Sequence, residues 1–203
     1  MNALLEKRDF FTLKNVLSRF NPNITTQDSL YFQASVQNTF GNNLQSIAAI
    51  KSLSEQYATR LDDDAWINLL NILADDYVKT YDYKSAAASY AILLRRYGNK
   101  LTQTDIAGYE NNYNLYKPLE NVPAQTVQFL DSEPITLSRD QQELWNVPVQ
   151  VNKKDSAHFI FDSGAGFSTI TRSAANHLGI TIIPANVKVN TANDKQVLAQ
   201  LGV

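Results

Sequence analysis

The spacing of apolar residues changes near Lys117, and this change limits the possible folds more than any other feature of the sequence. Before this point apolar residues recur every three or four positions, which is typical of amphipathic helices. After it, β-branched and aromatic residues alternate with polar ones, which is typical of strands. The sequence therefore predicts an α+β protein of two domains, an all-α domain followed by a β-rich domain.

Three prolines mark the boundary between these domains, because proline cannot continue a helix or donate a hydrogen bond within a sheet. They are Pro118, Pro123 and Pro134. We therefore place the helical domain at residues 1–120, a linker at 121–134 and the β domain at 135–203.

Turn residues divide the first domain into helices. One apolar pattern runs from Leu4 to Phe20, and a second helix follows from about residue 26 to Phe40. Gly41-Asn42 ends that helix, since glycine accepts the backbone conformation that closes a helix. Four further helices are predicted at about 43–58, 63–80, 84–97 and 103–116.

The helices of the first domain carry a repeated pattern. Asp9-Phe10-x-x-Leu13-x-x-Val16 recurs 34 residues later as Asn43-Leu44-x-x-Ile47-x-x-Ile50, and a looser copy begins at Asp82. A period near 34 resembles the tetratricopeptide (TPR) family, in which helix pairs stack on one another. The resemblance implies a TPR-like stack, and a generic helical bundle is the alternative. Tyrosines between Tyr77 and Tyr97 are expected to pack between helices, with a peptide-binding groove as the alternative.

Composition excludes several classes of function. The net charge of -2 provides no basic surface, so no nucleic-acid partner is expected. Without cysteine the chain has no disulfide, thiol nucleophile or cysteine zinc site. No apolar run approaches the roughly 20 residues of a membrane span, and the N-terminus lacks the pattern of a secretory leader. Either the protein is cytoplasmic or its leader has been removed.

The β domain is predicted to contain two hairpins. Strands are expected at 126–130, 134–137, 144–151 and 157–161, and the polar residues 152–155 join the last two as an antiparallel hairpin. Strands at 182–190 and 196–201 form the second hairpin, which closes around Ala192, Asn193, Asp194 and Lys195.

A carboxylate stands where the apolar run Phe159-Ile160-Phe161 ends, at Asp162. Ser163 adds a hydroxyl, and Gly164 permits a tight turn that a side chain would block. Ala165 and Gly166 keep the surroundings small. A carboxylate at the end of a buried strand is costly to ionise unless donors surround it, and the backbone N–H groups of this turn are the expected donors.

The stretch Ile160-Phe161-Asp162-Ser163-Gly164-Ala165 resembles the signature of the pepsin and retropepsin families. That signature is two apolar residues, Asp, Thr or Ser, Gly, then Ala or Ser. Ser168 matches a frequent Ser or Thr, and Ala174-Ala175-x-x-Leu178-Gly179-Ile180 looks like the short helix that follows the catalytic turn in bacterial and eukaryotic retropepsin-like proteins. Residues 147–152 look like the first strand and turn of that family, and the second hairpin looks like its flap.

This resemblance implies a partial acid-protease barrel at 135–203 and aspartic endopeptidase activity. Two carboxylates about 3 Å apart share one proton, so that one activates water and the other donates a proton. Asp162, Ser163 and Gly164 are implied as catalytic residues. The residues implied to bind a peptide or protein substrate are Ala165, Gly166, Ala192, Asn193 and Asp194. No metal or cofactor is expected.

A second copy of the motif does not occur in the sequence, and 135–203 is shorter than a complete retropepsin domain. We therefore expect the second carboxylate to come from a partner chain or from a C-terminal part that this sequence lacks. Unpaired strand edges predict a homodimer or strand exchange. The bacterial resemblance favours the periplasm or cell surface, with the cytoplasm as the alternative.

Two other interpretations remain open. Asp162 alone is compatible with an Asx turn, in which the carboxylate binds its own backbone. The whole chain is also compatible with a non-catalytic helical-repeat module that binds a peptide or protein and carries an incomplete protease half.

Overall fold

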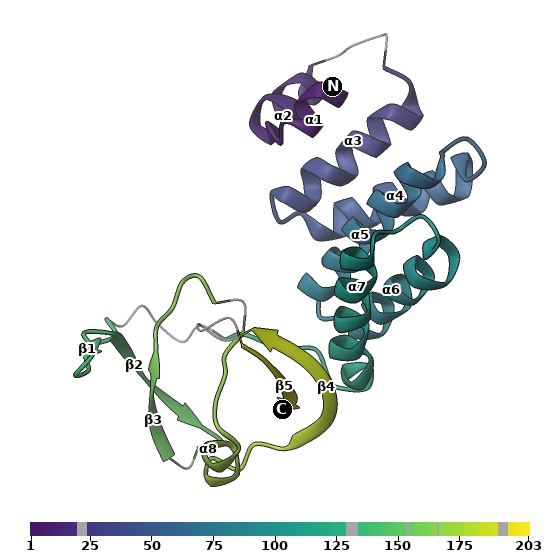
Figure 1. Cartoon of the computed structure of the whole chain (residues 1–203). Helices are drawn as coiled ribbons and strands as arrows, with labels where there is room; N and C mark the ends of the chain where they lie inside the picture. The colour runs from purple at the N-terminus through teal and green to yellow at the C-terminus, as the bar shows by residue number, and fades with distance from the viewer. Residues whose placement is uncertain (20–23, 129–133, 154, 166, 191–194) are drawn as a thin grey trace. The chain divides into compact units, whose positions relative to one another are not determined.

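The computed structural model describes residues 1–19, 24–128, 134–153, 155–165, 167–190 and 195–203 (Figure 1). The chain forms two compact units: unit 1 comprises 1–125 and 186–197, and unit 2 comprises 126–185 and 198–203. Over the described residues it has eight α-helices and two small sheets, so the α+β prediction is confirmed at that level. The domain boundaries at 120 and 134 stay a prediction. None of the helices in these ranges has the length and apolar character needed to cross a membrane.

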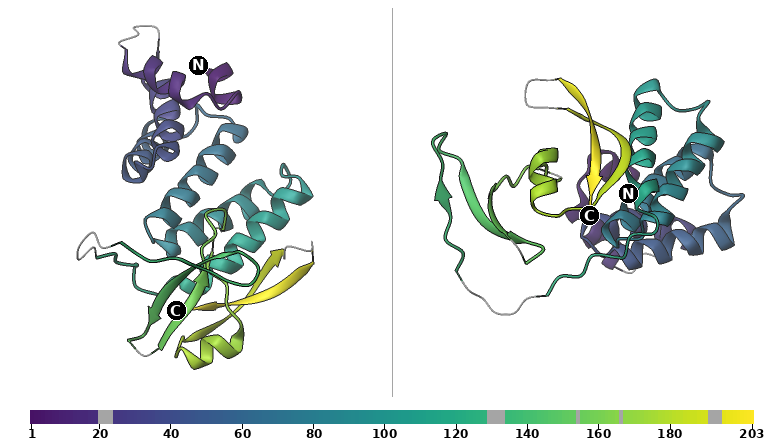
Figure 2. Two further views of the ribbon diagram at one scale, coloured as in Figure 1. Left: turned by 90° about the vertical axis from the view of Figure 1, so that its left-hand side faces the viewer. Right: turned by 90° about the horizontal axis from the view of Figure 1, so that it is seen from below.

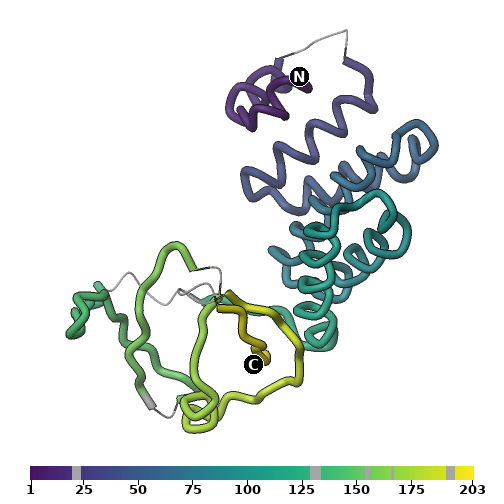
Figure 3. The backbone as a smooth tube through the Cα atoms, viewed as in Figure 1, coloured from purple at the N-terminus to yellow at the C-terminus, as the bar shows by residue number. Residues whose placement is uncertain are grey.

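Unit 1 contains seven of the described α-helices, which fold back on one another in sequence (Figure 3). They are α1 (Asn2–Glu6), α2 (Phe10–Ser18), α3 (Thr26–Thr39), α4 (Asn43–Tyr57), α5 (Asp63–Lys79), α6 (Tyr83–Tyr97) and α7 (Gln103–Tyr116), followed by the 3-10 turn η1 (Lys117–Leu119). The four helices predicted after Gly41 are confirmed to within one residue at each end. The pattern that begins at Leu4 is two helices rather than one, because the chain turns at Arg8 with φ of 54°.

Three short junctions in unit 1 share one backbone geometry. They join α1 to α2, α3 to α4 and α5 to α6, and each has a residue with positive φ directly before the N-cap of the next helix. These residues are Arg8, Gly41 and Tyr81, with φ of 54°, 74° and 60°. Each N-cap N–H then donates to the carbonyl five residues earlier, at 2.8–2.9 Å, which is the Schellman arrangement at a helix end.

The N-caps of these junctions also align the buried positions of the following helices. The caps are Asp9, Asn42 and Asp82, which lie 33 and 40 residues apart. The fourth residue after each cap is fully buried, and these residues are Leu13, Ser46 and Ala86. The alignment of Asp9 with Asn43 from the sequence was therefore wrong by one residue, because Asn42 occupies the cap position.

The helices α3, α5 and α7 each start with an extended N-cap whose side chain accepts a backbone hydrogen bond. The caps are Thr25, Asp62 and Thr102, which accept from the N–H three residues later at 3.1, 2.8 and 3.1 Å. The Asp105 carboxylate in turn accepts from the Thr102 N–H, which completes a capping box. From α2 to α7, N-caps of the Schellman arrangement therefore alternate with extended N-caps.

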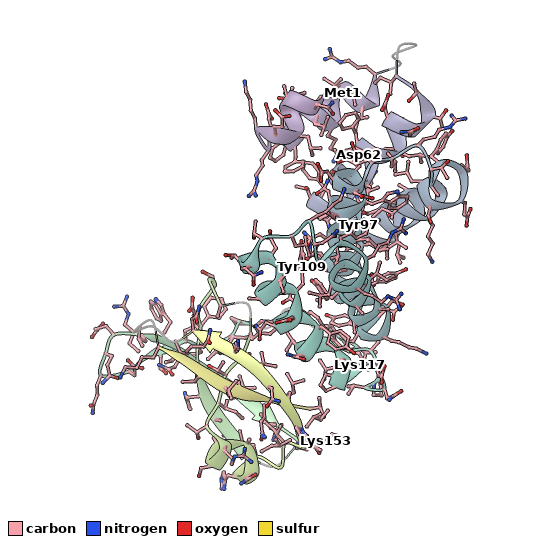
Figure 4. The ribbon with its side chains drawn as sticks, turned by 45° about the vertical axis from the view of Figure 1, so that its right-hand side comes forward. Met1, Asp62, Tyr97, Tyr109, Lys117 and Lys153 are labelled. Atoms are coloured by element: carbon pink, nitrogen blue, oxygen red, sulfur yellow. The ribbon has the colours of Figure 1, made fainter. Side chains whose placement is uncertain are left out.

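The core of unit 1 lies between successive helices. One cluster contains Leu13, Phe32 and Val36, and a second contains Ala34, Ala49, Ile50, Leu53 and Leu69. Tyr116 of α7 stacks against Tyr83 and Tyr90 of α6, with ring centroids 5.9 and 6.1 Å apart, and Tyr90 also meets Tyr109. Figure 4 labels Tyr109 on α7 and Tyr97 at the end of α6. The predicted inter-helix packing is confirmed for Tyr83, Tyr90 and the buried Tyr97.

Unit 2 contains a three-stranded antiparallel sheet in the order β1-β2-β3 (Figure 2). Its strands are β1 (Ser138–Arg139), β2 (Trp145–Val151) and β3 (Asp155–Ile160), and the short helix α8 (Arg172–His177) follows. The hairpin predicted around the turn after Val151 is confirmed. The strands predicted at 126–130 and 134–137 are wrong for the described residues 126–128 and 134–137, which have no strand partner. Their large apolar side chains, such as Ile135, are exposed and gain no packing.

The last two strands, β4 (Ile182–Asn190) and β5 (Gln196–Gly202), form a separate two-stranded sheet. At its base in unit 2, Thr181 and Val203 exchange two backbone hydrogen bonds of 2.9 Å. The part at 186–197 belongs to unit 1, where Asn111 binds the backbone N–H and carbonyl of Lys188 at 2.7 and 3.1 Å. The predicted strands of this hairpin are confirmed, and the partial barrel stays a prediction.

Candidate functional site

The β2–β3 pairing places Asp162 at the end of a strand. The register runs from Val151 opposite Asp155 to Asn146 opposite Ile160, and Phe161 N–H donates to the Trp145 carbonyl at 2.7 Å. Asp162 follows directly and is exposed. The expectation that the strand is buried as far as Phe161 is wrong, because that side chain is 60% exposed. Ile160, the last residue of β3, is also 57% exposed.

A tight turn surrounds the Asp162 carboxylate. Gly164 N–H donates to Asp162 Oδ1 at 2.8 Å, and Ala165 N–H donates to the Asp162 carbonyl at 3.2 Å. A Cβ on residue 164 would lie 3.3 Å from Oδ1, so glycine lets the backbone approach this closely. The turn therefore supplies a predicted donor. An Asx turn has the same bond, so this contact alone does not separate the catalytic from the structural interpretation.

The other predicted site residues fall into two groups. Ser163, Gly164 and Ala165 lie beside Asp162 and are exposed. Gly166, Ala192, Asn193 and Asp194 lie outside the described residues. Among the described side chains there is no group of three or more His, Cys, Asp or Glu residues that could hold a metal ion.

Large apolar side chains near Asp162 are exposed to solvent. They are Ile160, Phe161, Phe167 and Ile170. These four exposed apolar side chains therefore lie within ten residues of Asp162 in the sequence.

The helix α8 begins and ends with defined contacts. Thr171 caps its first turn by accepting from Ala174 N–H at 3.1 Å, and Ala175 and Leu178 are buried beneath it. Gly179 follows with φ of 68° and ends the helix. The side chain of Asn152, at the turn between β2 and β3, donates to the carbonyls of Leu178 and Gly179, both at 2.9 Å. Sequence analysis did not single out this residue.

A second network, also missed from sequence, supports the start of β2. Asp140 Oδ1 accepts from the N–H groups of Gln142 and Leu144 at 2.9 and 3.0 Å, and Oδ2 accepts from Asn146 at 3.2 Å. The bond from Leu144 is the largest cause that holds the pKa of Asp140 below its usual range. Asn146 is buried directly opposite Ile160 in the β2–β3 register. The network therefore fixes the strand beside the one that leads to Asp162.

Residues 147–203 match the family model for aspartyl proteases. The match begins within β2, includes Asp162, α8 and the β4–β5 sheet, and covers just over a quarter of the chain. Comparison with curated proteins and with solved structures gave no match. The C-terminal region is therefore similar to aspartyl proteases, in agreement with the motif at Asp162.

Proposed function

We propose that this chain is part of an aspartic endopeptidase in which Asp162 is one of two carboxylates that activate water. The observation that carries the proposal is the position of Asp162-Ser163-Gly164. These residues lie at the surface directly after β3, within the segment that matches the aspartyl protease family.

The proposed reaction needs a pair of carboxylates with one shared proton. The ionised member removes a proton from water, which attacks the peptide carbonyl, and the neutral member protonates the carbonyl oxygen. The tetrahedral intermediate then breaks its C–N bond as the amine leaves with a proton. Gly164 N–H would hold Oδ1 of Asp162 in a fixed orientation, and Ser163 would brace the two halves of the site.

We propose that a second copy of this motif, from a partner chain or from a further part of the same protein, supplies the other carboxylate. Of the unit 2 carboxylates other than Asp162 whose side chains the structure describes, Asp140 accepts hydrogen bonds within its own loop and Glu143 pairs with Arg139 at 2.7 Å. The exposed apolar residues near Asp162 support a covering chain. If two copies form the site, activity at low concentration should rise with the square of protein concentration.

The helical unit is proposed to be a TPR-like stack that binds a peptide or protein. Its three repeated junctions support the stack. An open groove of about 310 Å³ supports binding, because it combines amide, aromatic and charged side chains that include Asn68, Asn71, Tyr109 and Lys100. A non-catalytic module of this kind remains the second candidate function.

The decisive experiment is peptide cleavage by the wild-type chain and by Asp162→Asn, from acidic to neutral pH, with and without a pepstatin-type inhibitor. The substitution keeps the shape of the side chain and removes its charge. We expect cleavage to fall by about 10²–10⁴-fold, the usual contribution of acid–base catalysis, while folding is unchanged.

Glu55→Gln is the matched control, because it makes the same carboxylate-to-amide change at an exposed position of unit 1 that lies outside the groove. Cleavage by this control should equal that of the wild type. Unchanged cleavage in Asp162→Asn would refute the assignment of Asp162. No cleavage by the wild type at any concentration, together with peptide binding by unit 1, would favour the binding module.

A further inference from the structure

The Asn152 side chain connects the β2–β3 turn to the end of α8, 26 and 27 residues further along the chain. Its amide nitrogen donates to the carbonyls of Leu178 and Gly179, both at 2.9 Å. A primary amide has two N–H hydrogens, so this geometry uses its whole donor capacity. The contact therefore depends on an asparagine amide, and a carboxylate at the same place would have no hydrogen to donate.

The backbone on both sides suits this contact. Asn152 and Lys153 have φ of 53° and 57°, in the left-handed region, and asparagine is among the residues that tolerate this conformation. On the other side, the carbonyls at a helix C-terminus lack partners within the helix. Asn152 supplies partners for two carbonyls at the end of α8, next to the buried Leu178.

The chain between these two ends contains Asp162. It runs from the turn through β3 to Asp162 and returns through α8. In the described part of the chain, the hydrogen bonds found for Asp162 reach only Gly164 and Ala165, so they shape the turn without fixing it to the rest of unit 2. Anchoring comes from the two sides of the loop: Phe161 N–H holds the β3 side to Trp145, and Asn152 holds the far end of α8.

We propose that Asn152 is a positioning residue that fixes α8 against the β2–β3 turn and so sets the position of the Asp162 loop. The catalytic part of this inference rests on the proposed function of Asp162. Loss of the Asn152 bonds would let α8 shift relative to β3, and the loop between them would shift with it. Small displacements of a catalytic group lower turnover strongly, by up to about 10²-fold for 1 Å.

The test compares three variants of the whole chain. Asn152→Gly keeps the left-handed turn and removes both bonds, while Asn152→Asp keeps the side-chain shape but cannot donate when ionised. Lys153→Gly, at the neighbouring turn position, relaxes the same backbone conformation and keeps the Asn152 amide. Two-dimensional NMR of the Gly164 and Ala165 amides reports the loop, and kcat and KM report cleavage.

We expect the Gly164 and Ala165 signals to move in Asn152→Gly and Asn152→Asp and to stay in place in Lys153→Gly. In the two Asn152 variants kcat should fall by about tenfold or more with KM within about twofold, since positioning rather than binding is lost. Asn152→Asp should recover part of its kcat and its wild-type signals as the pH falls and its carboxyl regains a hydrogen. In the wild type, through-hydrogen-bond couplings should join the Asn152 amide to the carbonyls of residues 178 and 179.

Unmoved loop signals in folded Asn152→Gly would overturn the proposal, whatever happens to stability. If the Asn152 variants do not fold, absence of the through-bond couplings in the wild type would overturn it, and their presence with protected amide hydrogens would support it. If the protein cleaves no peptide even with any further part that carries a second copy of the motif, the proposed function fails, and the NMR measurements still decide whether Asn152 positions the loop.

Discussion

The two units differ in how far they bury their apolar side chains. In unit 1, Leu53, Leu69 and Leu93 are completely buried between successive helices. In unit 2, Phe167 is 62% exposed and Leu198 is 69% exposed, although both lie in the segment that matches a protease family. Each helix pair buries its apolar face on the next pair, whereas sheets of two or three strands leave a face without cover. Unit 1 therefore covers its own apolar core, whereas the described part of unit 2 leaves large apolar side chains exposed.

The two tryptophans allow this comparison to be measured. The sequence contains two, Trp66 on α5 and Trp145 on β2, so each unit has its own fluorescent reporter. The Trp66 indole N–H donates to the Ala58 carbonyl at 3.2 Å, and the guanidinium carbon of Arg139 lies 4.4 Å from the centre of the Trp145 ring. Replacing one tryptophan with phenylalanine leaves a signal from the other unit alone.

The largest expected difference comes from shortening a leucine in each unit. Leu53→Ala should lower the free energy of unfolding of unit 1 by about 2–5 kcal/mol, because it leaves a cavity in the core. Leu198→Ala should change the stability of unit 2 by no more than about 0.5 kcal/mol, because the side chain is exposed. Urea unfolding followed through Trp66 and Trp145 separately would measure both. Equal losses in the two units would contradict the comparison.

A buried carboxyl should make unit 1 sensitive to rising pH. Asp76 is fully buried; Asn38 donates to its Oδ1 at 2.9 Å, while Oδ2 has no partner among the described residues. Ser46 lies beside it but donates its hydrogen to the Ala34 carbonyl at 2.9 Å. Burial raises the pKa of Asp76, helped by Asp75 and opposed by the Ser46, Asn38 and Lys79 contacts.

Because the folded-state pKa of Asp76 is raised, its contribution to stability is complete below the ordinary aspartate pKa of 3.8 and is lost as pH rises through the folded pKa. Asp76→Asn removes the charge, and its amide can donate to Ser46. We expect the free energy of unfolding of unit 1 to be about 1–3 kcal/mol higher in this variant than in the wild type at pH 7, and to be equal in the two proteins near pH 3. Unfolding curves at both pH values, read through Trp66, test this. A gain that is independent of pH would show that the charge is not the cause.

A smaller effect should come from the repeated junctions of unit 1, which offer a matched pair. Gly41→Ala should cost about 1 kcal/mol, because a side chain at φ of 74° is strained. Arg8→Gly should be stabilising by less than about 1 kcal/mol, because relief of the left-handed strain at φ of 54°, roughly 1–2 kcal/mol, exceeds the entropy cost of glycine in the unfolded chain. Thermal unfolding of unit 1 would compare the two. The same sign for both changes would contradict the common geometry.

Local features of the chain made the helices predictable. Caps such as Asp62 and stops such as Gly41 act within a few residues, so their effect can be read from a short stretch of sequence. The repeat was misaligned at Asn42 because two adjacent asparagines both suit a cap. The break at Arg8 was missed because arginine rarely adopts positive φ.

Features that depend on distant partners were not predictable in the same way. The strand expected at 134–137 needs a neighbouring strand, which its own pattern does not reveal. Asp162 was placed correctly at a strand end, yet Phe161 was expected to be buried because the pattern does not show what covers the sheet. The contact of Asn152 spans 26 residues, and an asparagine after a strand indicates only a turn.

The smallest expected effect is an opposite pH response in unit 2, and it comes from an exposed carboxylate. Asp140 accepts hydrogen bonds from Leu144, Asn146 and Gln142, and these hold its pKa below the ordinary aspartate value of 3.8. A lowered folded-state pKa means that the stabilisation is present above 3.8 and is lost as pH falls through the folded value. Unit 2 should therefore become less stable in acid, where the Asp76 contribution to the stability of unit 1 is complete.

Asp140→Asn should lower the stability of unit 2 at pH 7 and make it less dependent on acid pH, whereas Glu143→Gln, a control on the same loop, should keep the wild-type slope of stability against pH. Trp145 fluorescence during urea unfolding at several acidic pH values measures that slope, and an equal slope in Asp140→Asn and the wild type would assign the acid sensitivity to another group.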